Sequence, residues 1–247
     1  MIELNKIYNE DCLVTLSNID DNSVDIVVTS PPYNKNIYAS ASGDKKSWGA
    51  LRGRQIAYDT YDDAMPPEDY ERWQKKVISE CLRILKPSGS MFYNHKDILV
   101  NGLIVPPKWV YDFPVHQQIV WNRGSSLAND PHYFQPITEY IYWIVKDPKK
   151  FFFDKSQATF RQSVWNINFE INTDHPAPFH VKLAQNCIRT TRPNDDCIVF
   201  DPFMGSASTA IAAIREKCNF IGSEISPKYC KMCETRIKNE FSQLTLF

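Results

Sequence analysis

The chain has 247 residues, of which 43% are hydrophobic and 23% charged. This length and composition predict one globular domain over residues 1–247 with a substantial core. The formal net charge of -1 excludes a uniformly basic nucleic-acid coat but not a local basic face.

The seven cysteines predict reduced thiols in a cytoplasmic protein and no disulfide framework. No apolar run reaches the ~20 residues that span a bilayer, so we expect no membrane association. Cys230 and Cys233 form a C-x-x-C pair without a second pair of ligands elsewhere, which favours helical packing over a metal site.

Apolar runs rich in β-branched residues predict the strands of the fold. They are Ser23–Thr29, Ser90–Asn94, Val115–Asn122, Glu139–Lys146, Asp196–Asp201 and Asn219–Ile225. Amphipathic spacing predicts a helix that starts near Pro67 and is closed by "KPSG", a second from His180 to Thr190, and a third after Phe203. Strands that alternate with helices predict an α/β fold with a mostly parallel sheet covered on both faces.

Two segments do not fit this pattern. Residues 34–63 are rich in serine, alanine, glycine and charge, and they are long for a connection in a compact domain, which predicts a functional or mobile loop. Its basic residues alternate with aromatic ones and suit either a solvated loop or an arm that contacts DNA phosphates. The DNA-facing candidates are Asn34, Lys45, Lys46, Arg52, Arg54 and Arg123. The second segment, Asp147–His180, alternates aromatic and polar residues, and this pattern predicts a small irregular unit beside the sheet.

The first predicted strand ends in "TSPPYN", from Thr29 to Asn34. Pro31 and Pro32 hold the backbone in an extended path and remove two amide donors, while their carbonyls can still accept hydrogen bonds. Taken alone, such a segment is typical of an ordinary proline-rich turn.

The second motif, "VFDPFMGSASTAIAAI", predicts a strand, a tight turn of small residues and a helix. Small side chains let a ligand approach the backbone, and the helix N-terminus offers oriented amide groups. Glu224 follows at the end of the next strand, about 20 residues on, where an acidic group in nucleotide-binding folds accepts hydrogen bonds from a ribose. Together these features favour a nucleoside cofactor.

In this order, "TSPPYN", "HPAPF" and "DPFMGSAST" make the chain resemble the β-class amino-group DNA methyltransferases, in which the catalytic half precedes the S-adenosylmethionine half. The resemblance covers nearly the whole chain. It implies a Rossmann-like methyltransferase fold with a seven-stranded, mostly parallel sheet that has one antiparallel strand. It also implies circular permutation relative to other methyltransferases, S-adenosyl-L-methionine as cofactor, and a small target-recognition segment at about 147–174.

The resemblance assigns site residues as well. Asp11 and Cys12 are expected beside the cofactor adenine, Glu224 at the ribose, and "HPAPF" at the methionine end. The full expected cofactor set is Asp11, Cys12, Thr29, His175, Pro176, Asp201, Pro202, Phe203, Gly205, Ser206 and Glu224. One departure stands out: Ala207 replaces the usual second glycine of the turn, and its methyl group is expected to crowd the cofactor.

The expected catalytic residues are Ser30, Pro31, Pro32 and Tyr33. An exocyclic amine is a poor nucleophile because its lone pair is delocalised into the ring. The Ser30 hydroxyl and the Pro31 carbonyl can hold its hydrogens while the lone pair faces the methyl group. The base must leave the duplex, and Tyr33 offers a ring on which it can stack.

The leading hypothesis is therefore a site-specific DNA methyltransferase of restriction-modification type, with cytosine-N4 favoured over adenine-N6 because Ser30 opens the motif. RNA and protein-glutamine methyltransferases carry their glycine-rich turn before the "PPY" loop, the reverse of the order here. The alternative of a DNA-binding protein that has lost catalysis is supported only by Ala207. The expected partners are double-stranded DNA and a cognate restriction endonuclease, and the chain is expected as a monomer or homodimer.

Overall fold

A computed structural model describes residues 2–34, 65–100, 103–126, 132, 134–168 and 179–244. Several predictions fall on positions beyond these ranges. The loop 34–63 after Asn34 lies outside the described residues, and so do Lys45, Lys46, Arg52, Arg54, His175 and Pro176.

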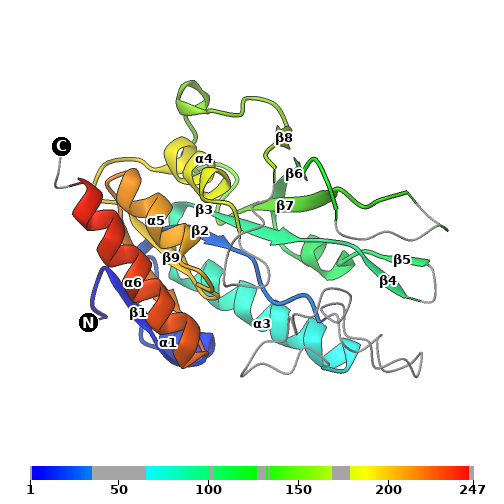
Figure 1. The fold of residues 1–247 in the computed structure, drawn as a ribbon, viewed down its shortest axis with the longest axis horizontal. Coiled ribbons are helices and arrows are strands. Elements are labelled where there is room, and N and C mark those ends of the chain that lie inside the picture. Colours follow the sequence, from blue (N-terminus) through cyan, green and yellow to red (C-terminus); the bar gives the residue numbers. More distant parts are fainter. Residues whose placement is uncertain are drawn as a thin grey trace.

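One large sheet organises the described part of the chain, with strand order β1-β10-β9-β2-β3-β7-β6-β8 (Figure 1). Its strands are β1 Lys6–Tyr8, β2 Val24–Thr29, β3 Leu85–His95, β6 Val115–Asn122, β7 Thr138–Val145, β8 Val164–Asn166, β9 Ile198–Asp201 and β10 Asn219–Ser223. Only β7 runs antiparallel to its neighbours β3 and β6. The mostly parallel sheet with one antiparallel strand is thereby confirmed. A separate hairpin joins β4 (Ile98–Val100) to β5 (Leu103–Val105).

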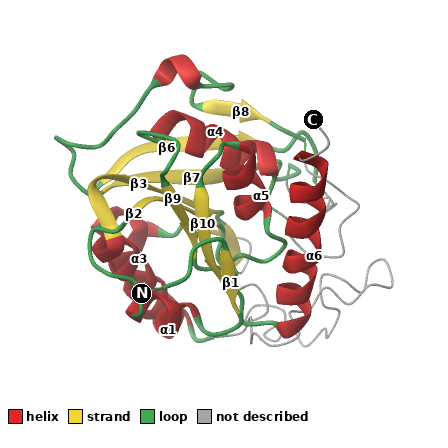
Figure 2. Cartoon of the chain, turned by 90° about the vertical axis from the view of Figure 1, so that its left-hand side faces the viewer, coloured by secondary structure: helices red, strands yellow, loops and turns green. Residues whose placement is uncertain are grey.

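Helices cover both faces of this sheet (Figure 2). They are α1 Cys12–Ser17, α3 Pro67–Ile84, α4 Val181–Thr191, α5 Ser208–Arg215 and α6 Pro227–Leu244, with short 3-10 turns η2 Lys108–Asp112 and η3 Lys155–Gln157. The helices α1 and α3 pack on one face and α4 and α5 on the other, so the sheet lies between two apolar cores. Cys233 of α6 is fully buried, in agreement with the expected helical packing of the C-x-x-C pair.

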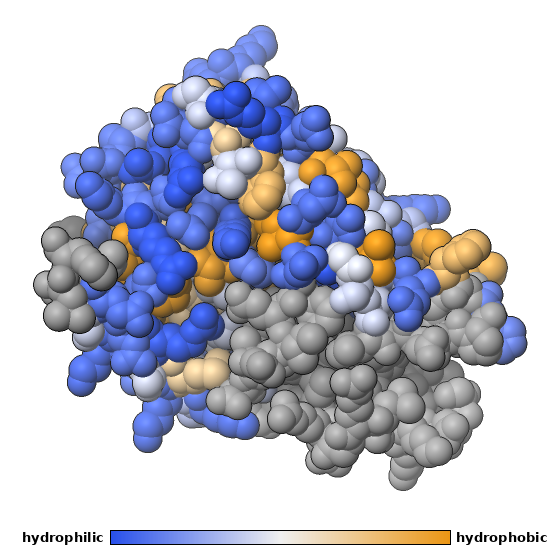
Figure 3. All heavy atoms as spheres, turned by 45° about the horizontal axis from the view of Figure 1, so that its top comes forward, coloured by the Kyte–Doolittle hydropathy of each residue, from blue (hydrophilic) through white to orange (hydrophobic). Residues whose placement is uncertain are grey.

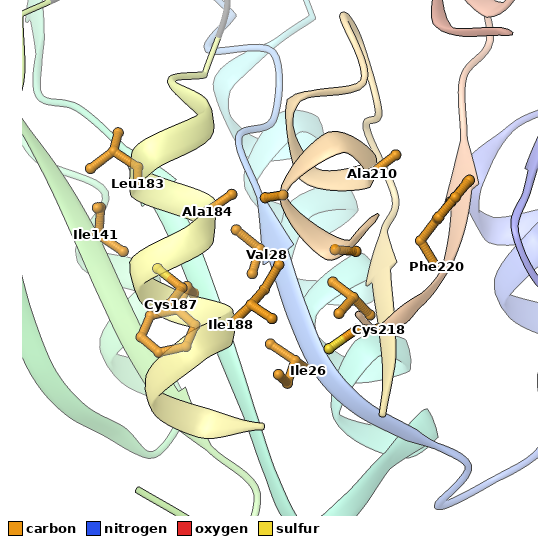
Figure 4. Close-up of a cluster of buried hydrophobic side chains, with 14 of the residues drawn as sticks. Ile26, Val28, Ile141, Leu183, Ala184, Cys187, Ile188, Ala210, Cys218 and Phe220 are labelled. Atoms are coloured by element: carbon orange, nitrogen blue, oxygen red, sulfur yellow. The ribbon is translucent and has the colours of Figure 1, made fainter. Parts of the chain in front are cut away.

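From Ile26 onward, alternate side chains of β2 pack into the two cores, as a period of two requires, and the bulge between Val24 and Ile26 shifts this alternation. Ile26 and Val28 point toward α4, where they meet Ala184, Cys187 and Ile188 (Figure 4). The opposite core takes Val24 and Val27 of β2, with Val77, Ile78 and Cys81 of α3. The outer face seen in Figure 3 is mostly hydrophilic, with apolar side chains scattered between the polar ones.

The start of β3 differs from the sequence prediction. The strand β3 begins at Leu85 rather than Ser90, and "KPSG" lies inside it, at a bulge where β2 pairs Val24 with Leu85 and Ile26 with Ser90. A Cβ on Gly89 would lie 2.8 Å from the Asp25 carbonyl oxygen, so the bulge needs a glycine at this position.

The sheet also has eight strands, one more than the expected seven. Part of the segment predicted as an irregular unit, Val164–Asn166, pairs in parallel with β6 and buries Trp165. Three residues are too few to show a strand pattern in the sequence.

The chain starts at the edge of the sheet, and the late unit β9–α5–β10 returns to lie between β1 and β2. This is the permuted order expected from the sequence. The connection that leaves β2 leads to α3 on one face, whereas the turn after β9 leads to α5 on the other. Ligands of open α/β sheets bind at such a point of divergence, beyond the carboxyl ends of the strands.

Candidate active site

The loop after β2 is held in place by α3 and by Met65, which lies just before the start of α3. The Tyr70 hydroxyl donates to the Pro32 carbonyl at 2.8 Å. The Asn34 side chain donates to the Met65 carbonyl at 2.6 Å and accepts from the Met65 amide at 2.8 Å. Asn34, predicted to face DNA, therefore fastens the end of the loop.

A buried polar network lies beneath Ser30 and Tyr33, whose hydroxyl oxygens are 2.9 Å apart. Tyr33 Oη is 3.2 Å from Glu139 Oε2. Asn94 Nδ2 lies 2.5 Å from Tyr33 Oη, 3.0 Å from Glu139 Oε2 and 3.2 Å from Ser30 Oγ, so its two protons are shared among three acceptors. Arg123 Nη1 lies 2.8 Å from Glu139 Oε1. Arg123, predicted to contact DNA, thus forms an ion pair with a carboxylate whose side chain is only 7% exposed.

Sequence reasoning missed Asn94 and Glu139. The only signal was that each places a polar side chain at the end of an apolar run, "SMFYN" and "EYIYWIVK". Buried polar side chains of this kind are rare unless they are hydrogen-bonded.

A cavity of about 550 Å³ opens beside the loop. Its aromatic walls come from Tyr33, Tyr70, His95 and Trp109. The His95 ring centroid lies 4.9 Å from that of Tyr33 and 5.7 Å from that of Trp109. Flat, apolar-faced walls with polar edges suit an aromatic ligand.

The turn after β9 is joined to the β2 loop through the Asp201 carboxylate. Thr29 Oγ1 donates to Asp201 Oδ1 at 2.7 Å, and Thr209 Oγ1 donates to Asp201 Oδ2 at 2.6 Å. The Phe203 amide donates to Oδ1 at 3.0 Å. Burial raises the pKa of the Asp201 carboxyl to about 6, and the bonds from Thr209 and Thr29 oppose that rise. Thr29 and Asp201, whose side chains were both predicted to contact the cofactor, are hydrogen-bonded to each other and hold the turn.

Glu224 holds the other side of the same turn. Its carboxylate accepts from the Gly205 amide at 2.8 Å and from the Ser226 amide at 2.9 Å. Gly205 has φ +55, in the left-handed region that favours glycine. Glu224 therefore fixes the turn at the carboxyl end of β10, the position at which an acidic group in nucleotide-binding folds accepts from a ribose.

Asp11 and Cys12 lie at the neighbouring strand end. Asp11 caps α1 by accepting from the Leu13 amide at 2.8 Å, and Cys12 is buried. The Asn9 side chain donates to the Glu224 carbonyl at 2.8 Å, which brings this segment to the carboxyl end of β10. The structure therefore gathers the expected adenine and ribose residues at one edge of the sheet.

The remaining residues of the turn point in different directions. The Phe203 ring packs edge-on against Trp73, with centroids 5.5 Å apart. The Ser206 carbonyl accepts from Arg236. Ala207 adopts the left-handed conformation, which glycine adopts more readily than alanine. Its methyl group is fully buried in the core cluster with α4 and α5. The expected crowding of the cofactor by this methyl group has no support in that packing.

Within the described ranges, no helix is long and apolar enough to cross a membrane. Among the same residues, no group of three His, Cys, Asp or Glu side chains forms a metal site.

Solved DNA methyltransferases share this architecture. The cytosine-N4-specific PvuII DNA methyltransferase superposes with a TM-score of 0.69, covering 98% of this chain and 93% of that chain at 18% identity. A DNA modification methylase of Thermus thermophilus, complexed with S-adenosyl-L-methionine, gives 0.66 over 95% of this chain and 93% of its own, at 22% identity. The fold is that of Rossmann-like DNA methyltransferases.

Sequence relationships give the family. Residues 24–235 match the N6/N4 methyltransferase family model, described as DNA methylase. The Type II methyltransferase M.BglII of Bacillus subtilis is 32% identical over 92% of this chain and 67% of its own length. The chain belongs to this family of DNA methylases.

Proposed function

We propose that the chain transfers a methyl group from S-adenosyl-L-methionine to the exocyclic amine of a flipped base in double-stranded DNA, with cytosine-N4 favoured over adenine-N6. The observation that carries this proposal is the 2.7 Å bond from Thr29 to Asp201. Ser30 follows Thr29 directly, and the small-residue turn follows Asp201. The bond therefore sets the amine-binding loop against the cofactor turn.

The residues of the turn fit S-adenosyl-L-methionine. Glu224 is only 9% exposed and accepts from the Gly205 amide, so its carboxylate lies at the turn, and Gly205 gives close access to the backbone. Asp11 and Cys12 are the proposed adenine contacts, and Pro202, Phe203 and Ser206 complete the proposed cofactor set. When bound, the cofactor supplies an electrophilic methyl group on a sulfonium centre.

The chain's own part is to bind and orient the amine. Ser30 Oγ and the Pro31 carbonyl accept its two hydrogens, and Pro31 and Pro32 keep the carbonyl in place. Tyr33 and His95, on the wall of the 550 Å³ cavity, offer aromatic surface to a base that has left the duplex.

Cytosine is favoured because a neutral hydroxyl suits the edge on which its amine lies beside a ring nitrogen. Adenine presents the same pattern, so adenine-N6 is the second candidate, and pocket size must supply the rest of the discrimination. The family model itself covers both target atoms.

A cognate restriction endonuclease is the proposed functional partner, supported by the relative M.BglII, which is named a Type II methyltransferase. A DNA substrate implies the cytoplasm as the place of action. The loop residues Lys45, Lys46, Arg52 and Arg54, together with Arg123, remain proposed DNA contacts, and residues 147–174 the proposed recognition segment.

The test is to incubate the protein with unmethylated genomic DNA and methyl-labelled S-adenosylmethionine, digest the DNA to nucleosides and analyse them by mass spectrometry. We expect 4-methylcytosine, in lower amount with Ser30→Ala. If 6-methyladenine appears alone, the preference for cytosine is wrong. Label that enters only RNA or protein would contradict a DNA substrate.

A further inference from the structure

Glu139 is a buried carboxylate that lies in contact with the catalytic loop. It sits near the start of β7, and its Oε1 is engaged by Arg123 at 2.8 Å. Its Oε2 faces Asn94 Nδ2 at 3.0 Å and Tyr33 Oη at 3.2 Å. An ionised carboxylate can only accept hydrogen bonds, so every neighbour at these distances must act as a donor toward it.

This requirement decides the direction of the bond between Tyr33 and Ser30. The Tyr33 hydroxyl has one proton, and it is donated to Glu139. The same proton is then not available to Ser30, whose oxygen lies 2.9 Å away. Ser30 must therefore be the donor and Tyr33 Oη the acceptor in that contact.

The consequence falls on the oxygen of Ser30. A serine hydroxyl has one proton and two lone pairs. The proton points at Tyr33, and one lone pair faces Asn94 Nδ2 at 3.2 Å, whose two protons are shared among Ser30, Tyr33 and Glu139. The second lone pair remains for another donor, and an amine N–H is such a donor. With the opposite orientation, Tyr33 would occupy that lone pair and the Ser30 proton would point toward the amine.

We propose that Glu139, held by Arg123, is a positioning residue that acts through Tyr33 to present Ser30 Oγ as a hydrogen-bond acceptor to the target amine. This inference rests on the proposed function, in which Ser30 binds that amine. It adds Glu139 and its link through Tyr33, which neither the motif nor the family match identifies.

The variant Glu139→Gln tests the proposal with little change of shape. Arg123 needs an acceptor, so the Gln oxygen should stay on its side and the amide nitrogen should face Tyr33 and Asn94. Tyr33 then loses its acceptor and turns its proton to Ser30. We expect kcat to fall about 10- to 100-fold, the effect of losing one hydrogen bond to a charged group, with the Kd values for cofactor and DNA unchanged.

A matched control exists in the Glu216–Arg189 pair. Glu216 has a side chain 6% exposed and lies 2.5 Å from Arg189, between α4 and the end of α5. Glu216→Gln should lower thermal stability as Glu139→Gln does and leave kcat at the wild-type value. If the two variants lose the same stability and both keep wild-type kcat, Glu139 is merely structural and the proposal fails.

Two further measurements separate the link through Tyr33 from other effects. When Glu139→Gln is added to Tyr33→Phe, kcat should fall less than about twofold below that of Tyr33→Phe alone, because the link is already broken. If the effects of the two substitutions are fully additive, the proposal is overturned. The 13C resonance of the Tyr33 ring carbon that carries the hydroxyl, assigned by its loss in Tyr33→Phe, should shift in Glu139→Gln and not in Glu216→Gln. This readout needs no methylation, so an inactive wild type would overturn the proposed function, whereas an unmoved resonance would overturn the link.

Discussion

Thr29 donates a hydrogen bond of 2.7 Å to Asp201, although 172 positions of sequence separate them. Each residue ends a central strand, β2 and β9, and each is followed directly by a candidate site loop. Both are buried, so the bond is shielded from water. The pairing of β2 with β9 sets the two strand ends side by side, and this side-chain contact joins the loops that follow them.

The first prediction concerns this contact. Thr29→Val keeps the shape of the side chain but removes the donor, so a buried carboxylate oxygen loses a partner. We expect the free energy of unfolding to fall by about 1–3 kcal/mol in urea titrations and methyl transfer to fall with it. Thr191→Val, which removes a buried hydroxyl bonded to a helix carbonyl at 2.8 Å, serves as control and should leave transfer unchanged. Equal activity of the two variants would contradict a role of Thr29 in joining the loops.

The second prediction follows from the pKa of Asp201, which burial raises to about 6 in the folded chain. The unfolded value is ~3.9, so between these two pH values the folded state holds the proton more tightly. The stabilisation from this proton is fully present below pH ~3.9 and is lost as the pH rises to about 6, on the order of 2–3 kcal/mol. Asp201→Asn cannot titrate. We therefore expect the stability of the wild type relative to this variant to fall from pH 4 to pH 6 in urea titrations and to stay level above. If the difference in stability between the wild type and Asp201→Asn stays constant over this pH range, the pKa of Asp201 in the folded chain is not about 6.

The strands that carry the two motifs, and the order of the motifs, could be predicted because their signals are local. A β-branched run that ends in "TSPPYN" and another that ends in "DPFMGS" each predict a strand and the loop after it from neighbouring residues alone. The turn glycine is likewise local, since Gly205 needs φ +55. Ala207 shows the limit of such reasoning: its replacement of glycine was visible, but the burial of its methyl group depends on helices that the motif does not contain.

Asn94 and Glu139 could not be predicted because their role depends on how distant strands pair. The antiparallel register of β3 and β7 sets Asn94 opposite Ile141 and His95 opposite Tyr140, which brings Glu139 to the end of β3. Nothing in either run specifies which strand reverses direction. The apolar runs also missed β1 and β8 for a similar reason, since each has three residues and is a strand only because β10 or β6 lies beside it.

The third prediction concerns Ala207, whose left-handed conformation strains a residue other than glycine. Ala207→Gly relieves that strain but removes a fully buried methyl group, and each effect is worth about 1 kcal/mol. We expect unfolding free energy to change by less than about 1 kcal/mol, and S-adenosylmethionine affinity to stay within about twofold in calorimetry. An affinity that rises about tenfold would show that the methyl group does crowd the cofactor.

The last prediction assigns the ribose contact. Glu224 accepts from two backbone amides, Gly205 and Ser226, at 2.8 and 2.9 Å. In Glu224→Gln the new amide group must face one of these donors, so one loop bond is lost together with the negative charge. We expect S-adenosylmethionine to bind about tenfold more weakly, and in Glu224→Ala about 1–3 kcal/mol more weakly than in the wild type.

The control for this prediction is Glu240→Gln on α6, because Glu240 is also 9% exposed and is paired with Arg215 at 2.6 Å. It should lose stability without any change in cofactor affinity by calorimetry. If Glu224→Gln behaves like this control, the carboxylate only braces the turn, and the ribose must be bound by another group. Weaker binding confined to the Glu224 variants identifies the carboxylate as part of the cofactor site, since the two substitutions remove the same charge from equally buried positions.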